Sequence, residues 1–257
     1  MTLAGDASDL VGPCGLRLEK ALSLLEQAGW VVPTDLVPDS APWLQWIVDG
    51  LCDLSSRDAL TGLANRRQFE AAIARELDRV ARIGEPALLL VADIDHFKRI
   101  NDSFGHAAGD VVIRSVASVL QECVRPMDLV ARIGGEEFAI ILPNCPHVFG
   151  QTVAERIRQR VAATPVAVIG GQQITVTVSI GGAFAPQWVR SSPALWSERA
   201  DQQLYRAKSE GRNRACLDMP PLTVVSAEEK SLLFAGVGQS DSNSDSGFGE
   251  FVPNNTP

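Results

Sequence analysis

The feature that most limits the fold is a pair of glycines, Gly134 and Gly135, between two short apolar runs. A glycine pair in this position predicts a tight turn, and a tight turn of this kind joins two antiparallel strands. The strand-like runs in the chain are at residues 87–93, 129–133, 137–142 and 173–184. The chain is therefore expected to build a sheet that contains at least one hairpin.

Helical patterns separate these strand-like runs. Apolar residues recur at three- and four-residue intervals in the segments 64–83, 107–123, 147–163 and 197–210. Helices mixed with a hairpin favour an α+β layer fold over a regular series of βαβ units. We expect a central sheet flanked by helices.

Two further helices are predicted before this domain. Leu18, Leu22 and Leu25 recur at helical spacing within residues 15–29, and residues 39–42 have the capping side chain and early proline of a helix start. The second helix then carries an apolar stripe, formed by Leu44, Ile47, Leu51 and Leu54. The stripe fits a helix packed on its own domain and a short dimerising stalk equally well, because a coiled coil needs about three or four heptads to be identified.

The balance of charge excludes some functions. The chain has 257 residues, with 31 acidic and 23 basic side chains and a net charge of −8. General binders of nucleic acid or anionic membranes carry surplus Lys and Arg, so neither role is expected, although one basic pocket for a phosphorylated ligand is compatible. No apolar run approaches the roughly 20 residues of a membrane span, and scattered cysteines indicate reduced thiols in a cytoplasmic protein.

Composition also divides the chain into three parts. Residues 1–55 form a predicted helical regulatory region, and residues 56–217 form the main domain. Residues 218–257 include a low-complexity segment at 239–247 that is rich in Ser, Asp and Asn. We expect this tail to be disordered, because it cannot bury enough apolar surface to offset the entropy of ordering.

A candidate metal site lies at the end of the first long strand. Asp93 and Asp95 close the apolar run, and alternation along a strand sends both side chains the same way, with Ile94 opposite. Carboxylates at a strand end suit Mg²⁺, which prefers oxygen ligands and completes its shell with water and phosphate. On this stretch alone, one solvated acid and one turn acid are the simpler interpretation.

The glycine pair continues into Glu136, Glu137 and Phe138. Glycine lets the backbone approach a ligand closely, and Glu136 can join Asp93 at one metal if their strands are neighbours. The alternative is a plain hairpin with exposed acids. The complete Gly-Gly-Glu-Glu-Phe motif between two apolar strands is much stronger evidence than a glycine pair alone.

Taken together, these motifs resemble those of the GGDEF-domain diguanylate cyclases, here in the GGEEF form. The matching segments follow the family order and are residues 57–67, 93–102, 104–106, 109–110, 134–138, 179–181, 200–201 and 207–213. The resemblance implies a sheet similar to the palm of nucleotidyl cyclases and polymerases. It also implies that two GTP molecules condense to cyclic di-GMP (c-di-GMP) and two pyrophosphates, in a dimer or higher oligomer whose domains face each other.

The resemblance implies roles for the metal ligands and catalytic groups. Asp93, the main-chain carbonyl of Ile94 and Glu136 are expected to bind Mg²⁺, for which Mn²⁺ can substitute. Glu136 is also the expected acceptor of the 3′-hydroxyl proton, and Lys98 is expected to stabilise charge in the transition state. Indirect or structural roles are at least as strongly expected for Asp95 and Glu137.

The substrate contacts come from the same resemblance. Lys208 and Arg212 are expected to hold the β- and γ-phosphates, although a basic helix end followed by a turn favours cations in any case. At Gly135 the chain is expected to pass close to the phosphates. The residues expected to read guanine or to lie near the nucleotide are Asn101, Asp110 and His106.

A further motif lies just before the hairpin. Arg125 and Asp128 match the RxxD inhibitory site of the family, at a fixed offset from Gly134 and Gly135. Arginine can grip phosphate and stack on guanine, while aspartate accepts from the guanine edge. The resemblance therefore implies inhibition by the product c-di-GMP, with Arg156 as a secondary contact.

Three functions remain open: an active cyclase, a domain that binds GTP or c-di-GMP without turnover, and a cyclase with a different purine preference. The intact acids and Lys98 favour the active enzyme over the binding domain. Since two active sites must meet, we expect the helices within residues 15–56 to control the encounter, by self-association or by docking a regulatory protein. A helical bundle packed on its own domain is the alternative.

Overall fold

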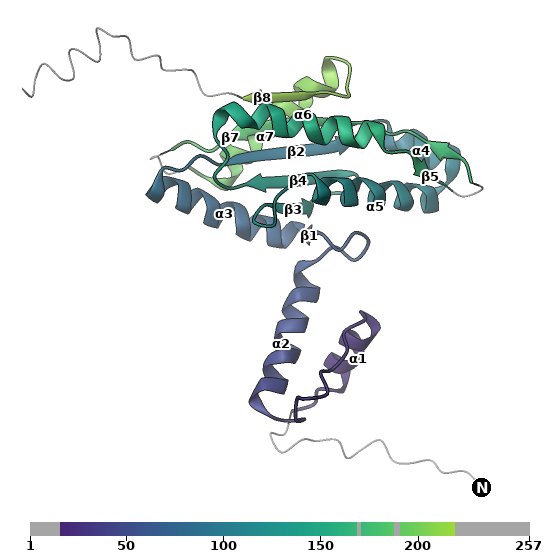
Figure 1. The fold of residues 1–257 in the computed structure, drawn as a ribbon, viewed down its shortest axis with the longest axis vertical. Helices are drawn as coiled ribbons and strands as arrows, with labels where there is room; N and C mark the ends of the chain where they lie inside the picture. Colours follow the sequence, from purple (N-terminus) through teal and green to yellow (C-terminus); the bar gives the residue numbers. More distant parts are fainter. Residues whose placement is uncertain (1–15, 169–170, 188–190, 219–257) are drawn as a thin grey trace, which may run out of the picture. The chain divides into compact units, whose positions relative to one another are not determined.

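A six-stranded mixed sheet forms the centre of the computed structural model, which describes residues 16–168, 171–187 and 191–218 (Figure 1). The strand order is β1-β3-β4-β2-β7-β8, and β5 and β6 form a separate two-stranded sheet. The strands are β1 (Ala64–Asn65), β2 (Leu88–Ile94), β3 (Leu129–Arg132), β4 (Glu137–Leu142), β5 (Val166–Ala167), β6 (Gln173–Ile174), β7 (Val178–Phe184) and β8 (Ala215–Asp218). The helices are α1 (Glu19–Gln27), α2 (Ala41–Ser56), α3 (Arg66–Ile83), α4 (Phe97–Phe104), α5 (His106–Glu122), α6 (His147–Ala163) and α7 (Pro193–Ser209).

Helices cover both faces of the large sheet. On the central strand β2, Leu88 and Leu90 belong to a core shared with α5 and α6, while Leu89 and Val91 belong to a core shared with α3 and α7. A strand that is buried on both faces must be apolar throughout, which explains the unbroken run before Asp93. The predicted α+β class, with a sheet flanked by helices, is confirmed.

The register of the sheet brings the predicted acids together. β3 and β4 pair in an antiparallel manner, which confirms the hairpin at the glycine pair. β2 lies between β4 and β7, so that Asp93 is opposite Glu137 on one side and Ser179 on the other. The strand that ends in Asp93 is therefore the direct neighbour of the strand that follows Glu136.

The run at residues 173–184, predicted as one strand, is divided into β6 and β7. β6 pairs only with β5, whereas β7 joins the large sheet beside β2. Between them, the Thr177 carbonyl accepts a hydrogen bond of 2.9 Å from the Asp95 amide. Alternation of β-branched residues was a correct sign of extended backbone, but it does not show that the two halves have different partners.

The N-terminal helices α1 and α2 pack on each other around Leu25, Trp43 and Ile47. Gly50 permits the close approach, since a Cβ atom there would lie only 2.6 Å from Cδ2 of Leu25. Ser40 caps α2 by accepting a hydrogen bond from the Trp43 amide, as the sequence predicted. The apolar stripe of α2 packs against α1.

Some sequence predictions fall on residues that the structure does not describe. The expected tail begins at residue 218, which is the last residue of β8, and residues 219–257 lie outside the described part. Within the described ranges, every helix is too short or too polar to cross a membrane.

Candidate active site

The charged site lies where β2 ends beside the hairpin turn. Asp93 is 6% exposed, and its Oδ2 lies 2.7 Å from Nζ of Lys208 on α7. The amide of Ile94 donates a hydrogen bond of 3.2 Å to the carbonyl of Glu136, which joins the strand end to the turn. The structure therefore brings together Asp93, Ile94, Glu136 and Lys208.

Negative charge exceeds positive charge at this site. Burial raises the pKa of Asp93, and although Lys208 opposes the rise, the charges of Glu137 and Asp95 add to it. Burial and then the charge of Asp93 also raise the pKa of Glu136. The two carboxylates thus lie close enough to repel each other, and a bound cation would relieve this repulsion.

The acids do not by themselves form a complete metal site. Among the described residues, no group of three or more His, Cys, Asp or Glu side chains is arranged to hold a metal ion. The predicted ligand set contains two carboxylates and one main-chain carbonyl. Mg²⁺ keeps several water or phosphate oxygens in its shell, so an incomplete protein set of this kind fits Mg²⁺ together with a nucleotide.

Asp95 has a different environment from Asp93. It is 5% exposed, and its two oxygens accept hydrogen bonds of 2.6 Å from Thr177 Oγ1 and 2.6 Å from Ser179 Oγ. A third hydrogen bond of 3.0 Å comes from the main-chain amide of Asn213. These donors occupy both oxygens of Asp95, so its geometry fits the indirect role that the sequence allowed.

The residues predicted around the guanosine lie on α4 and α5. Oδ1 of Asn101 is buried, with no hydrogen-bond partner in the described structure. Gly109 leaves the space for it, because a Cβ atom at that position would overlap Asn101 Oδ1. Lys98, His106 and Asp110 are exposed, and no hydrogen bond or ion pair among the described residues joins them to the acids.

The two predicted phosphate ligands lie at the end of α7 and in the turn after it. Lys208 forms an ion pair with Asp93, and the Lys208 side chain is 34% exposed. Arg212 is exposed, in a turn where it and Asn213 have positive φ values of 62° and 45°. The structure therefore places Lys208 in contact with Asp93 and leaves the side chain of Arg212, four residues further along the chain, exposed to solvent.

An ion pair that anchors the hairpin turn was missed from the sequence. Nη1 of Arg132 lies 3.2 Å from both carboxylate oxygens of Asp58, and its Nη2 donates a 2.8 Å hydrogen bond to the Gly135 carbonyl. Asp58 also accepts hydrogen bonds from the amide and hydroxyl of Thr61. Asp58 belongs to one of the matching segments, but 74 positions separate it from Arg132 and no pattern in the sequence pairs them.

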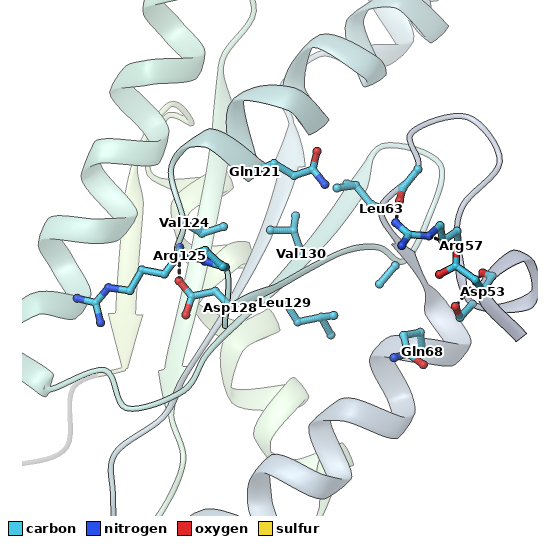
Figure 2. Close-up of a pocket in the computed structure, with 14 residues that line it drawn as sticks. Asp53, Arg57, Leu63, Gln68, Gln121, Val124, Arg125, Asp128, Leu129 and Val130 are labelled. Atoms are coloured by element: carbon cyan, nitrogen blue, oxygen red, sulfur yellow. Dashed lines mark hydrogen bonds and ion pairs between the residues drawn. The ribbon is translucent and has the colours of Figure 1, made fainter. Parts of the chain in front are cut away.

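The RxxD residues form a tight loop between α5 and β3. The Arg125 amide donates a hydrogen bond of 2.7 Å to Oδ2 of Asp128, and Figure 2 shows the Arg125 guanidinium extending away from the pocket that Leu63 and Val130 line. On the other side of the loop, Arg125, Asp128 and Arg156 line a second pocket of about 470 Å³. The structure therefore brings Arg156 to the motif from α6.

Comparison with known proteins identifies the family. Residues 55–214 match the family model described as diguanylate cyclase, GGDEF domain. The chain is 45% identical over 157 residues to the diguanylate cyclase DgcP of Pseudomonas aeruginosa. The matched region covers 61% of this chain and 23% of DgcP. The chain spans less than half the length of the first curated relatives that it matches.

Two solved structures extend the similarity beyond the catalytic domain. The coiled coil and GGDEF domain of DgcB from Caulobacter crescentus, in complex with c-di-GMP, is 32% identical, with a TM-score of 0.65 over 78% of this chain and 100% of that one. The diguanylate cyclase SiaD from Pseudomonas aeruginosa, in complex with its activator SiaC, is 32% identical, with a TM-score of 0.63 over 77% of this chain and 73% of that one. By its motifs, its fold and these similarities, the chain belongs to the GGDEF-domain family of diguanylate cyclases.

Proposed function

We propose that this protein condenses two GTP molecules into c-di-GMP and two pyrophosphates. The observation that carries the proposal is the pair of neighbouring acids, Asp93 and Glu136, whose pKa values are raised by burial and whose repulsion a cation would relieve. Acids whose pKa values are shifted by burial and by a neighbouring charge are typical of catalytic sites. The intact acids, together with membership of the family, favour turnover over nucleotide binding alone.

A divalent metal ion fits the site, and GGDEF cyclases generally depend on one. We assign Asp93, Glu136 and the carbonyl of Ile94 as its protein ligands, with Mg²⁺ as the natural ion and Mn²⁺ as a substitute. When bound, the metal supplies charge neutralisation and lowers the pKa of a coordinated hydroxyl.

The reaction itself is an attack of the 3′-hydroxyl of one GTP on the α-phosphate of the other, with pyrophosphate as the leaving group. Glu136 accepts the hydroxyl proton in this proposal. Lys98 stabilises charge on the phosphoryl group, while Lys208 and Arg212 hold the β- and γ-phosphates. Lys208 can turn from Asp93 to a phosphate because its side chain is partly exposed.

Guanine recognition is assigned to Asn101 and Asp110. The buried, unpartnered Oδ1 of Asn101 supports this role, since a buried acceptor without a donor is costly unless a ligand supplies one. His106 lies near the nucleotide in the proposal, and the chain at Gly135 passes close to the phosphates, where the absence of a side chain leaves room.

Two chains must meet face to face, so the active species is a homodimer or a higher oligomer. We assign control of this encounter to α1 and α2, which expose apolar side chains of Leu24 and Val48, with Val31 exposed in the segment between them. Docking of a regulatory protein on these helices is supported by the similarity to SiaD, which was solved with its activator. Deleting residues 1–50 should lower specific activity and weaken self-association.

Product inhibition is assigned to the RxxD loop. Arg125, Asp128 and Arg156 line one pocket, and this grouping of two guanidinium groups with one carboxylate suits phosphate and the guanine edge of c-di-GMP. Replacing Arg125 with alanine should relieve inhibition by added c-di-GMP and leave the initial rate unchanged.

The central experiment incubates the purified chain with GTP and Mg²⁺ over a range of protein concentrations and separates the products by chromatography. We expect c-di-GMP and pyrophosphate, with specific activity that rises with protein concentration. A parallel incubation with ATP tests purine choice. Binding of GTP without any product, at all concentrations, would favour the nucleotide-binding domain instead.

A further inference from the structure

Asp95 is a buried carboxylate that ties three distant segments together. Its hydrogen bonds reach Thr177 just before β7, Ser179 within β7, and the turn after α7 through the Asn213 amide. Among the described residues no cation lies within ion-pair distance of it, so hydrogen bonds alone compensate its burial. A buried charge with three donors marks a position that the fold must hold closely.

The turn that Asp95 holds has an unfavourable backbone conformation. Gly211, Arg212 and Asn213 have consecutive positive φ values of 114°, 62° and 45°. Arginine has no intrinsic preference for this region, so surrounding contacts must hold the turn. Two such contacts act on Asn213: its amide donates to Asp95, and its Oδ1 accepts a hydrogen bond of 2.7 Å from Arg158 on α6.

We propose that Asp95 is a positioning residue, which holds the turn at residues 211–213 so that Arg212 is directed at the terminal phosphates of GTP. This inference rests on the proposed function, because it needs Arg212 to be a phosphate ligand. It goes beyond that function by giving Asp95, the acid directly after β2, a task separate from metal binding.

The placement of the two acids at the end of β2 supports this division of labour. Asp93 lies in β2 and forms an ion pair with the side chain of Lys208 in the last turn of α7. Asp95 follows directly after the last residue of β2 and accepts a hydrogen bond from the main-chain amide just beyond Arg212. The end of β2 thus contacts the chain at or beside each of the two phosphate ligands, Lys208 and Arg212.

The hydrogen bonds predict different consequences for two substitutions. In Asp95→Asn, the amide oxygen can replace Oδ2 and still accept from the Asn213 amide. Its NH₂ group then replaces Oδ1 and donates to Ser179, whose hydroxyl can accept as well as donate. In Asp95→Ala, all three hydrogen bonds are lost. A proton carrier would behave differently, because the asparagine amide does not exchange a proton in this way, and a metal ligand would bind Mg²⁺ more weakly, because the amide oxygen is neutral.

The test measures binding of 3′-deoxy-GTP and of GMP, both with Mg²⁺, by calorimetry on the full chain. The deoxy analogue lacks the attacking hydroxyl, and GMP lacks the phosphates that Arg212 would hold. We expect Asp95→Ala to weaken 3′-deoxy-GTP binding by about ten- to hundred-fold, the range for a lost charged hydrogen bond, with GMP binding unchanged. Asp95→Asn should bind 3′-deoxy-GTP within about threefold of the wild type, the difference expected when the hydrogen bonds are kept.

A double-mutant cycle connects the effect to Arg212. Arg212→Ala should weaken 3′-deoxy-GTP binding, and adding Asp95→Ala to it should cause little further loss, since both changes remove one contact. Additive losses, or an Asp95→Asn variant as weak as Asp95→Ala, would overturn the inference. If the wild type bound neither nucleotide, the proposed function would be wrong as well as the inference. This result differs from the two that would overturn the inference alone, so the experiment tells the two failures apart.

Arg158→Ala is the second variant, for the case in which Asp95→Ala does not fold. It removes the other hydrogen bond to Asn213 and leaves Asp95 intact. We expect a several-fold loss of 3′-deoxy-GTP affinity, as for one lost hydrogen bond, and no change for GMP. Wild-type affinity for 3′-deoxy-GTP in this variant would contradict the role of the turn.

Discussion

Two groups of charged side chains flank the same glycine turn, and the fold treats them in opposite ways. Burial raises the pKa values of Asp93 and Glu136, and Lys208 only partly opposes the rise. Burial also acts to raise the pKa of Asp58, but hydrogen bonds from Thr61 and Arg132 outweigh it and the net shift is downward. At neutral pH the charges of Asp93 and Glu136 therefore lower the free energy of unfolding, whereas the charge of Asp58 raises it.

The comparison separates what the turn needs for folding from what it needs for chemistry. The ion pair of Asp58 and Arg132 is complete within the chain and holds the Gly135 carbonyl in place. The acids remain under-compensated, and a bound cation and nucleotide would supply what is missing. We call the Asp58–Arg132 ion pair, with its hydrogen bond to the Gly135 carbonyl, the clamp. This stable clamp supports a site whose acids are unfavourable for folding, as expected where function conflicts with stability.

The largest effect is expected for Glu136→Gln. Removing the acid should lower the rate of c-di-GMP formation by at least about 100-fold, because it removes a metal ligand and the proton acceptor. Its raised pKa means that the charge is unfavourable in the folded state, so the melting temperature should stay constant or rise by about 1–4 °C.

Thermal denaturation and product analysis of the same preparation measure both quantities. Glu70→Gln, at an exposed site on α3, makes the same chemical change outside the predicted set of metal ligands and serves as the control. A lower melting temperature for Glu136→Gln would break the comparison, since the acid would then be stabilising.

Arg132→Ala should be the most destabilising change at the turn. It removes the partner of Asp58 and the donor to the Gly135 carbonyl, so we expect a loss of about 1–3 kcal/mol in unfolding free energy. Arg132→Lys keeps a charge for Asp58 but not the forked geometry, and should be intermediate. Urea denaturation measures the loss, and equal stability of the alanine variant and the wild type would refute the clamp.

The pH dependence of this clamp sharpens the comparison. The pKa of Asp58 is lowered in the folded state, so its contribution is complete well above the ordinary value of 3.8 and is lost as the pH falls through the folded value. The stability difference between the wild type and Arg132→Ala should therefore be constant near neutrality and shrink below pH 3.8. Urea denaturation of both chains across this range tests the sign, and a difference that grows on acidification would contradict it.

The smallest effect is expected for an exposed ion pair of α3. Arg66 and Glu70 have side chains that are 74% and 62% exposed, and solvent screens their attraction. Arg66→Ala should change the unfolding free energy by less than about 0.5 kcal/mol, measured by the same urea titration. A loss as large as that of Arg132→Ala would mean that the clamp is not special among the ion pairs of the domain.

Local sequence patterns were sufficient to predict many of the helices and strands and to identify the residues of the acidic site. Apolar periodicity located the long helices, and Ser40 marked the start of α2 because capping depends on the nearest few residues. The hairpin placed Glu136 beside a strand, and the family motif named Asp93 as its partner. These features are local, or are repeated as a recognisable motif, so a linear sequence displays them.

The partners of the charged side chains depended on the order of strands. Asp95 meets Thr177 and Asn213 across separations of 82 and 118 residues, and Asp58 meets Arg132 across 74. Periodicity tells which face a side chain takes, but contacts between distant segments exist only once β2 lies between β4 and β7. The order of residues thus specified the family, the elements and the acids, while the tertiary structure decided that Asp93 would contact a lysine and Asp95 a distant turn.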